Sequence, residues 1–191
     1  MNEQLQRCSW VNVRYPLYIR YHDEEWGVPV QDDRYLFEML LLESFMTGLS
    51  WECVLNKRQA FRAAFADFDP AAVACFSPEK VESLLLNPGI IRHRRKIEAA
   101  VANARAFLKI QQEFGSFYAY LRTFAGDAPI EEAWQSRTSS PLSDALSADL
   151  KRRGMRFTGS VVMYSFLQAV GIISAHGREC FKAFPDTKNK N

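Results

Sequence analysis

The sequence predicts an all-α fold, and three observations lead to this prediction. Helix-capping residues stand directly before prolines at several points of the chain. A long segment after Pro88 carries its apolar residues at helical spacing, and strand-like alternation is scarce. Proline is favoured at the first position of a helix and breaks its interior, so the capped prolines indicate helix starts.

The first long helix is predicted from about residue 34 to residue 47. Asp32 and Asp33 precede it, and a carboxylate in that position accepts hydrogen bonds from the free N–H groups of the first turn. Three later helix starts carry the same kind of signal: Asp69-Pro70, Ser77-Pro78 and Ser140-Pro141.

The longest predicted helix covers residues 90–112. Its apolar residues recur at spacings of three, four or seven positions and form one helical stripe: Ile90, Ile97, Val101, Ala104 and Leu108. Residues 142–153 and 159–170 complete the set. The last segment is apolar on nearly all sides, which predicts a central position.

Length and composition are those of a globular chain. Its 191 residues are 48% hydrophobic, 13% aromatic and 24% charged, unlike a disordered sequence. We expect one helical unit over residues 1–185, either as a single body or as two interleaved lobes with a pocket between them. Residues 186–191 are polar and are expected to form a disordered tail.

The chain lacks the sequence signals of export or membrane insertion. Residues 1–7 contain no apolar run typical of a signal peptide, and no later stretch reaches the roughly 18 apolar residues that cross a bilayer. We therefore expect a cytoplasmic protein. The net charge of +2 is too small to identify a nucleic-acid partner, so a basic binding surface must be local.

Two cysteines and two histidines at opposite ends of the chain form a candidate metal site. Cys8 and His22 lie near the start, and His176 and Cys180 lie near the end. Two thiolates and two imidazoles suit a tetrahedral, structural Zn²⁺ site with no position left for water. The alternative is a set of buried thiols and hydrogen-bonded histidines, and residues this far apart in sequence favour neither interpretation.

A tight turn at residues 84–91 predicts a helix-hairpin-helix, in which Gly89 can adopt the positive φ that other residues avoid. Basic or potentially basic side chains occupy positions 92–96, in the expected first turns of a helix. Free N–H groups at a helix start, together with Arg and Lys, bind phosphate, so we expect this hairpin to hold DNA without reading its sequence. The predicted DNA-binding residues are Gly89, Ile91, Arg92, Arg94 and Lys96. The alternative is a solvated charged surface.

Glu43 is the candidate acid of a binding pocket. It shares a helical stripe with apolar residues three, four and seven positions away, so its carboxyl group is expected to be desolvated. A carboxyl group buried without a partner holds a proton, meets a cation or serves in binding. Glu38 is less informative, because Arg34 stands at the right spacing to pair with it.

Three aromatic residues are candidates for the walls of this pocket. Trp51 follows the Glu43 helix closely, and Trp10 and Tyr21 stand beside the candidate metal ligands. Aromatic faces and one buried acid suit a flat, cationic base through stacking and cation-π attraction. Core packing is the alternative for each aromatic residue taken alone.

Taken together, several segments resemble the DNA-3-methyladenine glycosylase I family. The resemblance runs from Arg7 to Cys180, about nine tenths of the chain. It rests on the segments 7–10, 16–18, 21–29, 36–39, 48–51, 89–94, 96–97, 143–146 and 164–166.

The resemblance implies a helix-hairpin-helix DNA glycosylase that excises 3-methyladenine from alkylated double-stranded DNA. It also implies that Zn²⁺ is bound at the candidate metal site and joins the N- and C-terminal segments. The implied base pocket has Glu43 as its catalytic residue and Tyr21, Trp51 and Trp10 as base-binding residues. We expect the protein to be a monomer.

The expected reaction is hydrolysis that leaves an abasic site without strand cleavage. Many relatives in the superfamily place a catalytic aspartate about twenty residues beyond the hairpin, and this chain has none there. No lysine stands out as a Schiff-base nucleophile either.

One segment departs from the pattern usual in that family, Glu-Gly-x-Gln-Ala-Gly-Leu-Ser-Trp. Between Glu43 and Gly48 this chain has Ser44-Phe45-Met46-Thr47. Phe45 and Met46 either reshape base selectivity or face the core. Two alternatives therefore stay open: a glycosylase of altered lesion specificity, or a non-catalytic, zinc-stabilised helix-hairpin-helix module that binds DNA.

Overall fold

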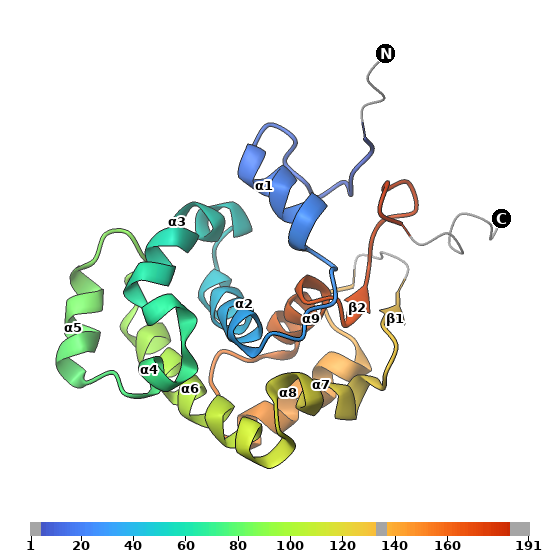
Figure 1. The fold of residues 1–191 in the computed structure, drawn as a ribbon. Coiled ribbons are helices and arrows are strands. Elements are labelled where there is room, and N and C mark those ends of the chain that lie inside the picture. The colour runs from blue at the N-terminus through green and yellow to red at the C-terminus, as the bar shows by residue number, and fades with distance from the viewer. Residues whose placement is uncertain (1–4, 133–136, 184–191) are drawn as a thin grey trace.

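The computed structural model describes residues 5–132 and 137–183, and this part of the chain is almost entirely helical (Figure 1). The prediction of a helical fold is confirmed, and the predicted tail at residues 186–191 lies outside the described residues. The elements in chain order are α1 (Pro16–Arg20), η1 (Tyr21–Glu25, a π-helix), α2 (Asp33–Met46), α3 (Trp51–Ala64), η2 (Ala66–Phe68), α4 (Pro70–Ala74), α5 (Pro78–Leu86), α6 (Arg94–Phe114), α7 (Phe117–Ala125), β1 (Ile130–Glu131), α8 (Pro141–Arg152), α9 (Ser160–Ala169) and β2 (Ile173–Ser174).

Helices α2 and α9 form the centre of the fold, with the other helices around them (Figure 1). Every residue from Leu36 to Phe45 in α2 is buried. The buried apolar side chains of the described residues form one connected core. The central position predicted for residues 159–170 is therefore confirmed.

The predicted helix caps are present in the structure. The Asp32 side chain accepts a hydrogen bond from the backbone of Tyr35 at the start of α2. Asp69, Ser77 and Ser140 cap α4, α5 and α8 in the same way. These caps depend on residues two or three positions apart, which is why the local sequence predicts them well.

The predicted helix-hairpin-helix corresponds to α5, the turn after it and α6. Two details of the prediction are wrong. Helix α6 begins at Arg94 rather than Ile90, with His93 as its cap, because residues 90–93 belong to the turn. Gly89 does not have a positive φ. It is instead a point of close approach, since an added Cβ would lie 3.0 Å from the Ala60 Cβ on α3.

The predicted pairing of Arg34 with Glu38 is also wrong. Arg34 pairs with Asp67 and Asp69 at the surface. Glu38 is buried and instead pairs with two arginines of α3. The helix turns Glu38 inward, toward partners that are 20 or more residues away in the sequence.

The two ends of the described chain run side by side (Figure 1). The backbone N–H of Phe181 donates to the carbonyl of Gln6 at 2.8 Å. Strands β1 and β2 pair in parallel nearby, with Ile130 opposite Ile173. No helix within the described ranges is long and apolar enough to cross a membrane.

Candidate active site and metal centre

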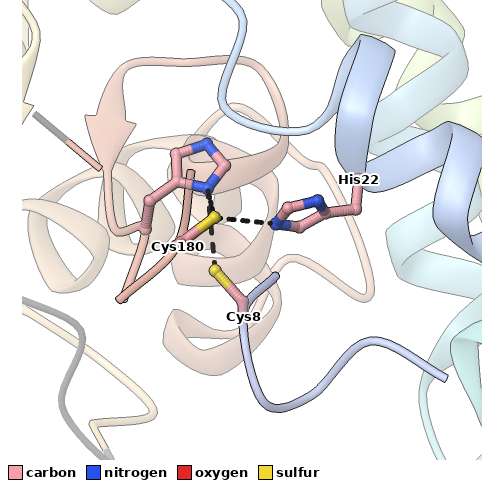
Figure 2. A group of neighbouring side chains, drawn as sticks. Cys8, His22 and Cys180 are labelled. Atoms are coloured by element: carbon pink, nitrogen blue, oxygen red, sulfur yellow. Dashed lines mark hydrogen bonds between the residues drawn. The ribbon is translucent and has the colours of Figure 1, made fainter. Parts of the chain in front are cut away.

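The candidate metal ligands meet where the two ends of the chain come together (Figure 2). Cys8, His22, His176 and Cys180 are all buried, and their ligand atoms lie within 4.8 Å of one another. The Sγ atom of Cys180 lies 3.5 Å from Nε2 of His22 and 3.6 Å from Nδ1 of His176. Tetrahedral zinc with bonds of about 2.3 Å to sulfur and about 2.0 Å to nitrogen would hold such atoms about 3.6 Å apart, so these contacts and the donor set of two thiols and two imidazoles fit this ion.

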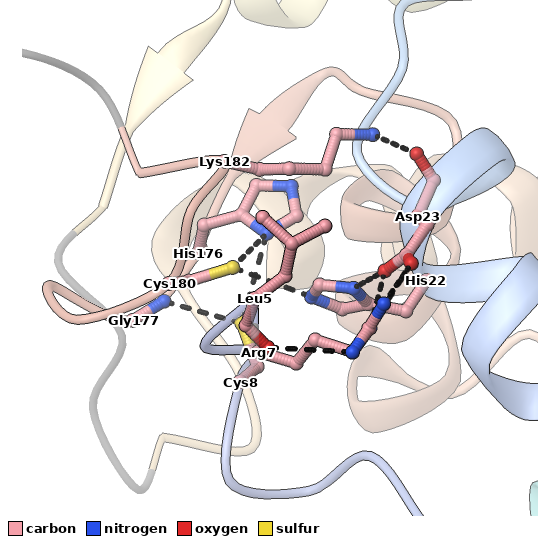
Figure 3. A network of polar contacts seen from close by, with 9 residues as sticks. All are labelled: Leu5, Arg7, Cys8, His22, Asp23, His176, Gly177, Cys180 and Lys182. Carbon is pink, nitrogen blue, oxygen red and sulfur yellow. Dashed lines mark hydrogen bonds and ion pairs between the residues drawn. The ribbon is translucent and has the colours of Figure 1, made fainter. Parts of the chain in front are cut away.

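The ligands are held in orientation by surrounding hydrogen bonds (Figure 3). Nδ1 of His22 lies 2.8 Å from the Asp23 carboxylate, which leaves Nε2 facing the cluster. Arg7 in turn donates to Asp23, at 2.6 Å from its Nη2. The backbone N–H of Gly177 points at Sγ of Cys8 over 3.3 Å. Such support around histidine and cysteine ligands is typical of protein metal sites.

Burial favours the protonation state that a metal requires in the imidazoles but not in the Cys8 thiol. It lowers the pKa of His22, and it lowers that of His176 to about 4, so both imidazoles are neutral as metal ligation requires. Burial also raises the pKa of the Cys8 thiol to about 12. Thiol deprotonation therefore needs a positive charge at the centre of the cluster.

Aromatic residues connect this cluster to a cavity of about 280 Å³. The Trp10 and Trp26 rings lie 4.8 Å apart, and Trp26 lies edge-on to His176 at 4.7 Å. The cavity is lined by Trp10, Tyr18, Tyr21, Trp26, Glu43, Met46, Trp51, Ser165 and Gln168. The four pocket residues predicted from the sequence therefore meet in one cavity.

Two buried polar atoms of the cavity residues have no partner among the described residues. They are Oε2 of Glu43 and Nε1 of Trp51. Glu43 is 4% exposed, and burial raises its pKa to about 8, so its carboxyl group holds a proton at neutral pH. The Trp51 ring lies 5.1 Å from the Tyr21 ring. A buried polar group left unpaired is costly, and these two offer a donor and an acceptor to a ligand.

Four residues of the cavity wall were not predicted from the sequence. Tyr18 and Trp26 come from the segment around η1, and Ser165 and Gln168 come from α9. The three-residue spacing of Ser165 and Gln168 was the available signal, since it interrupts an otherwise apolar helix on one side.

The unusual segment after Glu43 divides between the core and the cavity. Phe45 is 1% exposed and packs against Phe61 and Phe65. The hydroxyl of Ser44 donates to the carbonyl oxygens of Leu40 and Phe157. Met46 is the member of this segment that lines the cavity.

The basic side chains of the hairpin differ in their exposure and in whether they already have hydrogen-bond partners within the protein. Arg92 and Arg95 are exposed. Arg94 is exposed as well, but it donates two hydrogen bonds to Glu82, at 2.6 and 2.8 Å. Lys96 is 7% exposed, and its ammonium donates to the carbonyls of Phe45 and Thr47 at the end of α2. It therefore stabilises the unpaired carbonyl end of that helix, where a cation is favoured.

Helix α3 joins the hairpin to the cavity. It begins with Trp51, which lines the cavity, and two turns later Lys57 donates to the carbonyl of Pro88 at 3.0 Å. Ala60, on the next turn, touches Gly89. The hairpin is thus fixed relative to one wall of the cavity.

Known proteins resemble the chain over most of its length. Residues 10–183 match the family model described as methyladenine glycosylase. DNA-3-methyladenine glycosylase 1 of Escherichia coli strain K12 is 46% identical over 180 residues, which cover 92% of this chain and 96% of that protein.

Two solved structures show the same fold. A crystal structure of 3-methyladenine DNA glycosylase I has a TM-score of 0.90 and 48% identity, covering 94% of this chain and 100% of that one. A tyrosine-to-phenylalanine variant of 3-methyladenine DNA glycosylase I in complex with 3-methyladenine has a TM-score of 0.87 and 36% identity, covering 97% and 98%.

Proposed function

The chain belongs to the methyladenine glycosylase family, and on that premise we propose that it hydrolyses the N-glycosidic bond of 3-methyladenine in alkylated DNA. Water adds its hydroxyl group to the sugar carbon and releases its remaining proton to the solvent. The electron pair of the broken glycosidic bond stays with the methylated base, which leaves as a neutral molecule. The DNA strand keeps an abasic site and stays intact.

The observation that carries this proposal is the pair of unpartnered polar atoms in an aromatic cavity. Oε2 of Glu43 and Nε1 of Trp51 have no partner within the described part of the chain. The cavity of about 280 Å³ has room for a single flat base. A protein that only bound DNA would gain nothing from burying an unpaired acid in an open aromatic cavity, so the geometry favours base recognition.

A 3-methylated adenine in DNA carries positive charge on its ring, which weakens the glycosidic bond. The nucleotide must first leave the duplex, at a cost of a few kcal/mol that is smaller for damaged bases. Tyr21 and Trp51 then contact the ring by stacking and cation-π attraction. A cationic ring beside Glu43 favours the carboxylate form of the acid, which accepts hydrogen bonds from the base.

We assign the DNA contacts of the hairpin to backbone groups and to its free cations. The candidates are Ile91, Arg92 and Arg95. Arg94 contributes less because it is paired with Glu82, and Gly89 contributes less because its backbone N–H donates to Oδ1 of Asn87 at 2.8 Å. The hydrogen bonds of Lys96 give it a role inside the protein beside any contact with DNA.

We propose that Cys8, His22, His176 and Cys180 hold a structural Zn²⁺. Bound there, the ion would fix the thiolates and imidazoles in place and thereby the aromatic wall beside them. Cys180→Ser is expected to remove the metal, measured by elemental analysis, and to lower the melting temperature. Cys75→Ser is the matched control, because that thiol is exposed. An unchanged metal content in Cys180→Ser would contradict the proposed site.

Met46 supports a second candidate, a glycosylase of altered lesion specificity. It lines the cavity at the position where the family pattern has a glutamine. A carboxamide both donates and accepts hydrogen bonds, whereas a thioether is only a weak acceptor. Met46 therefore discriminates between bases by van der Waals contact rather than by hydrogen bonding. Met46→Gln is expected to change the ratio of 3-methylguanine to 3-methyladenine released.

The deciding experiment is the release of free bases from methylated DNA, resolved by chromatography. The wild type should release 3-methyladenine above a heat-inactivated control. Borohydride treatment should trap no covalent DNA adduct. If no base is released at all, the non-catalytic DNA-binding module becomes the better interpretation.

A further inference from the structure

A network of four charges, two of them buried and two half-buried, lies beside Tyr21, a residue of the cavity wall. Glu25 of η1, Glu38 of α2, and Arg58 and Arg62 of α3 belong to it. Nε of Arg58 donates to Glu38 at 2.7 Å, and its Nη1 donates to Glu25 at 2.6 Å. Arg62 donates to both oxygens of Glu38, at 2.9 and 3.0 Å. Arg58 therefore bridges two carboxylates from different elements.

The network joins three elements that supply predicted contacts of the base, namely η1, α2 and α3. Tyr21 begins the π-helix that Glu25 ends, and Glu43 lies on the same helix as Glu38. Trp51 lies two turns before Arg58 on α3, and a separation of seven residues puts both on the same side of the helix.

Tyr21 lines the base cavity and also a second cavity, of about 190 Å³, whose wall includes Glu25, Arg58 and Arg62 among others. Tyr21 therefore borders both the base cavity and the space beside the network.

A network of this kind contributes little net free energy to the stability of the fold. Removing charges from water costs about as much as their attraction returns, and apolar residues of similar size often stabilise as well or better. The planar fork of arginine instead fixes two partners in one geometry, which a lysine does not. Its benefit is a defined placement of the elements that carry it.

We propose that Arg58 is a positioning residue for the base cavity, holding Tyr21 at a fixed place relative to Glu43 and Trp51 through its ion pairs to Glu25 and Glu38. The inference rests on the proposed function, because the positioned groups are those that contact the base. Loss of Arg58 lowers the affinity for the base and leaves the affinity of the hairpin for DNA unchanged.

The test uses Arg58→Met combined with Glu25→Gln, which keeps the network neutral because the Arg62–Glu38 pair stays. The matched control is Arg153→Met with Glu113→Gln. Arg153 also bridges two carboxylates, Asp149 and Glu113, at 2.6 Å each, and lies beside a tyrosine ring, but it is remote from the cavity lining.

Calorimetry with free 3-methyladenine measures the affinity for the base, and calorimetry with undamaged duplex DNA measures the affinity of the hairpin for DNA. We expect the double variant Arg58→Met, Glu25→Gln to raise the Kd for the free base about tenfold or more and the Kd for the duplex by less than about twofold. The control should change neither Kd. The Kd of Arg58→Lys for the free base should fall between those of the wild type and the double variant, since lysine restores the charge without the planar fork.

A folded double variant that binds the free base as tightly as the wild type would overturn the inference. If the double variant does not fold, the Kd of Arg58→Lys for the free base decides, and an unchanged value again overturns the inference. Failure of the proposed function looks different, because the wild type itself would then neither bind nor release 3-methyladenine.

Discussion

The cavity and the hairpin treat their polar groups in opposite ways. In the cavity, Glu43 and Trp51 each leave a buried polar atom without a partner among the described residues. On the hairpin, Arg94 and Lys96 already have partners inside the protein. A run of charged residues in a sequence therefore suggests more groups free to bind a ligand than the structure offers. A single buried acid, by contrast, is easily overlooked although it is free to bind one.

The largest expected effect comes from removing the acid of the cavity. Glu43→Gln should lower 3-methyladenine release on the order of a hundredfold or more, because the amide cannot become a carboxylate beside a cationic base. Single-turnover base release measures this. Glu52→Gln is the control, since Glu52 lies outside this cavity. A rate within a few-fold of the wild type would remove Glu43 from the site.

The same substitution should stabilise the protein in a pH-dependent way. The folded state keeps the Glu43 proton up to about pH 8, whereas the group's ordinary pKa is 4.5. Between these values the folded state binds one proton more than the unfolded state, so the free energy of unfolding falls as pH rises. The stability advantage of Glu43→Gln over the wild type should therefore grow from pH 5 to pH 8 in thermal melts. An advantage independent of pH would show that Glu43 is ionised in the folded protein.

Lys96→Met tests whether that residue belongs to the interior. The substitution leaves two carbonyls at the end of α2 without their donor, at a cost of about 1–3 kcal/mol in the free energy of unfolding. Urea unfolding measures it. Lys109→Met on the same helix is the exposed control and should change stability little. Equal free energies of unfolding for Lys96→Met and Lys109→Met would show that the Lys96 side chain lies at the surface.

Arg92 and Arg95 should carry the salt dependence of DNA binding. Replacing both by alanine should reduce the slope of log Kd against log salt by about 2, since each phosphate contact contributes about 0.9. Fluorescence anisotropy with undamaged duplex measures the slope. An unaltered slope would place these side chains away from the DNA.

The smallest effect is expected for Arg94→Ala in the same titration. Its bidentate pair with Glu82 offsets its charge, so the slope should change by less than about 0.9. Arg94→Ala with Glu82→Gln separates the two contributions. A full unit of slope from Arg94 alone would mean that the ion pair opens on DNA binding.

Much of this architecture was predictable because it depends on neighbours in the sequence. The caps at Asp32, Asp69, Ser77 and Ser140 are local, and the burial of Glu43 follows from helical periodicity. The candidate metal cluster was only half predictable: the residue types indicated a possible site, but spacing alone could not bring together residues 168 positions apart.

The remainder depended on packing that no local pattern records. Phe45 and Met46 are adjacent on a helix buried on nearly all sides, so periodicity could not tell core from cavity. The partners of Glu38 lie 20 and 24 residues away. Lys96 reaches carbonyls 49 and 51 residues earlier in the chain. Each of these contacts is decided by how helices meet.

The meeting of the two chain ends has a topological consequence. Cys8 and His176 lie 3.6 Å apart, so the backbone between them is nearly a closed ring. A covalent closure of a ring this long would remove about 5 kcal/mol of chain entropy from the unfolded state. A circular permutant with its ends joined near this cluster and reopened at the exposed turn after Ala125 should therefore depend less on metal for its stability than the native chain order.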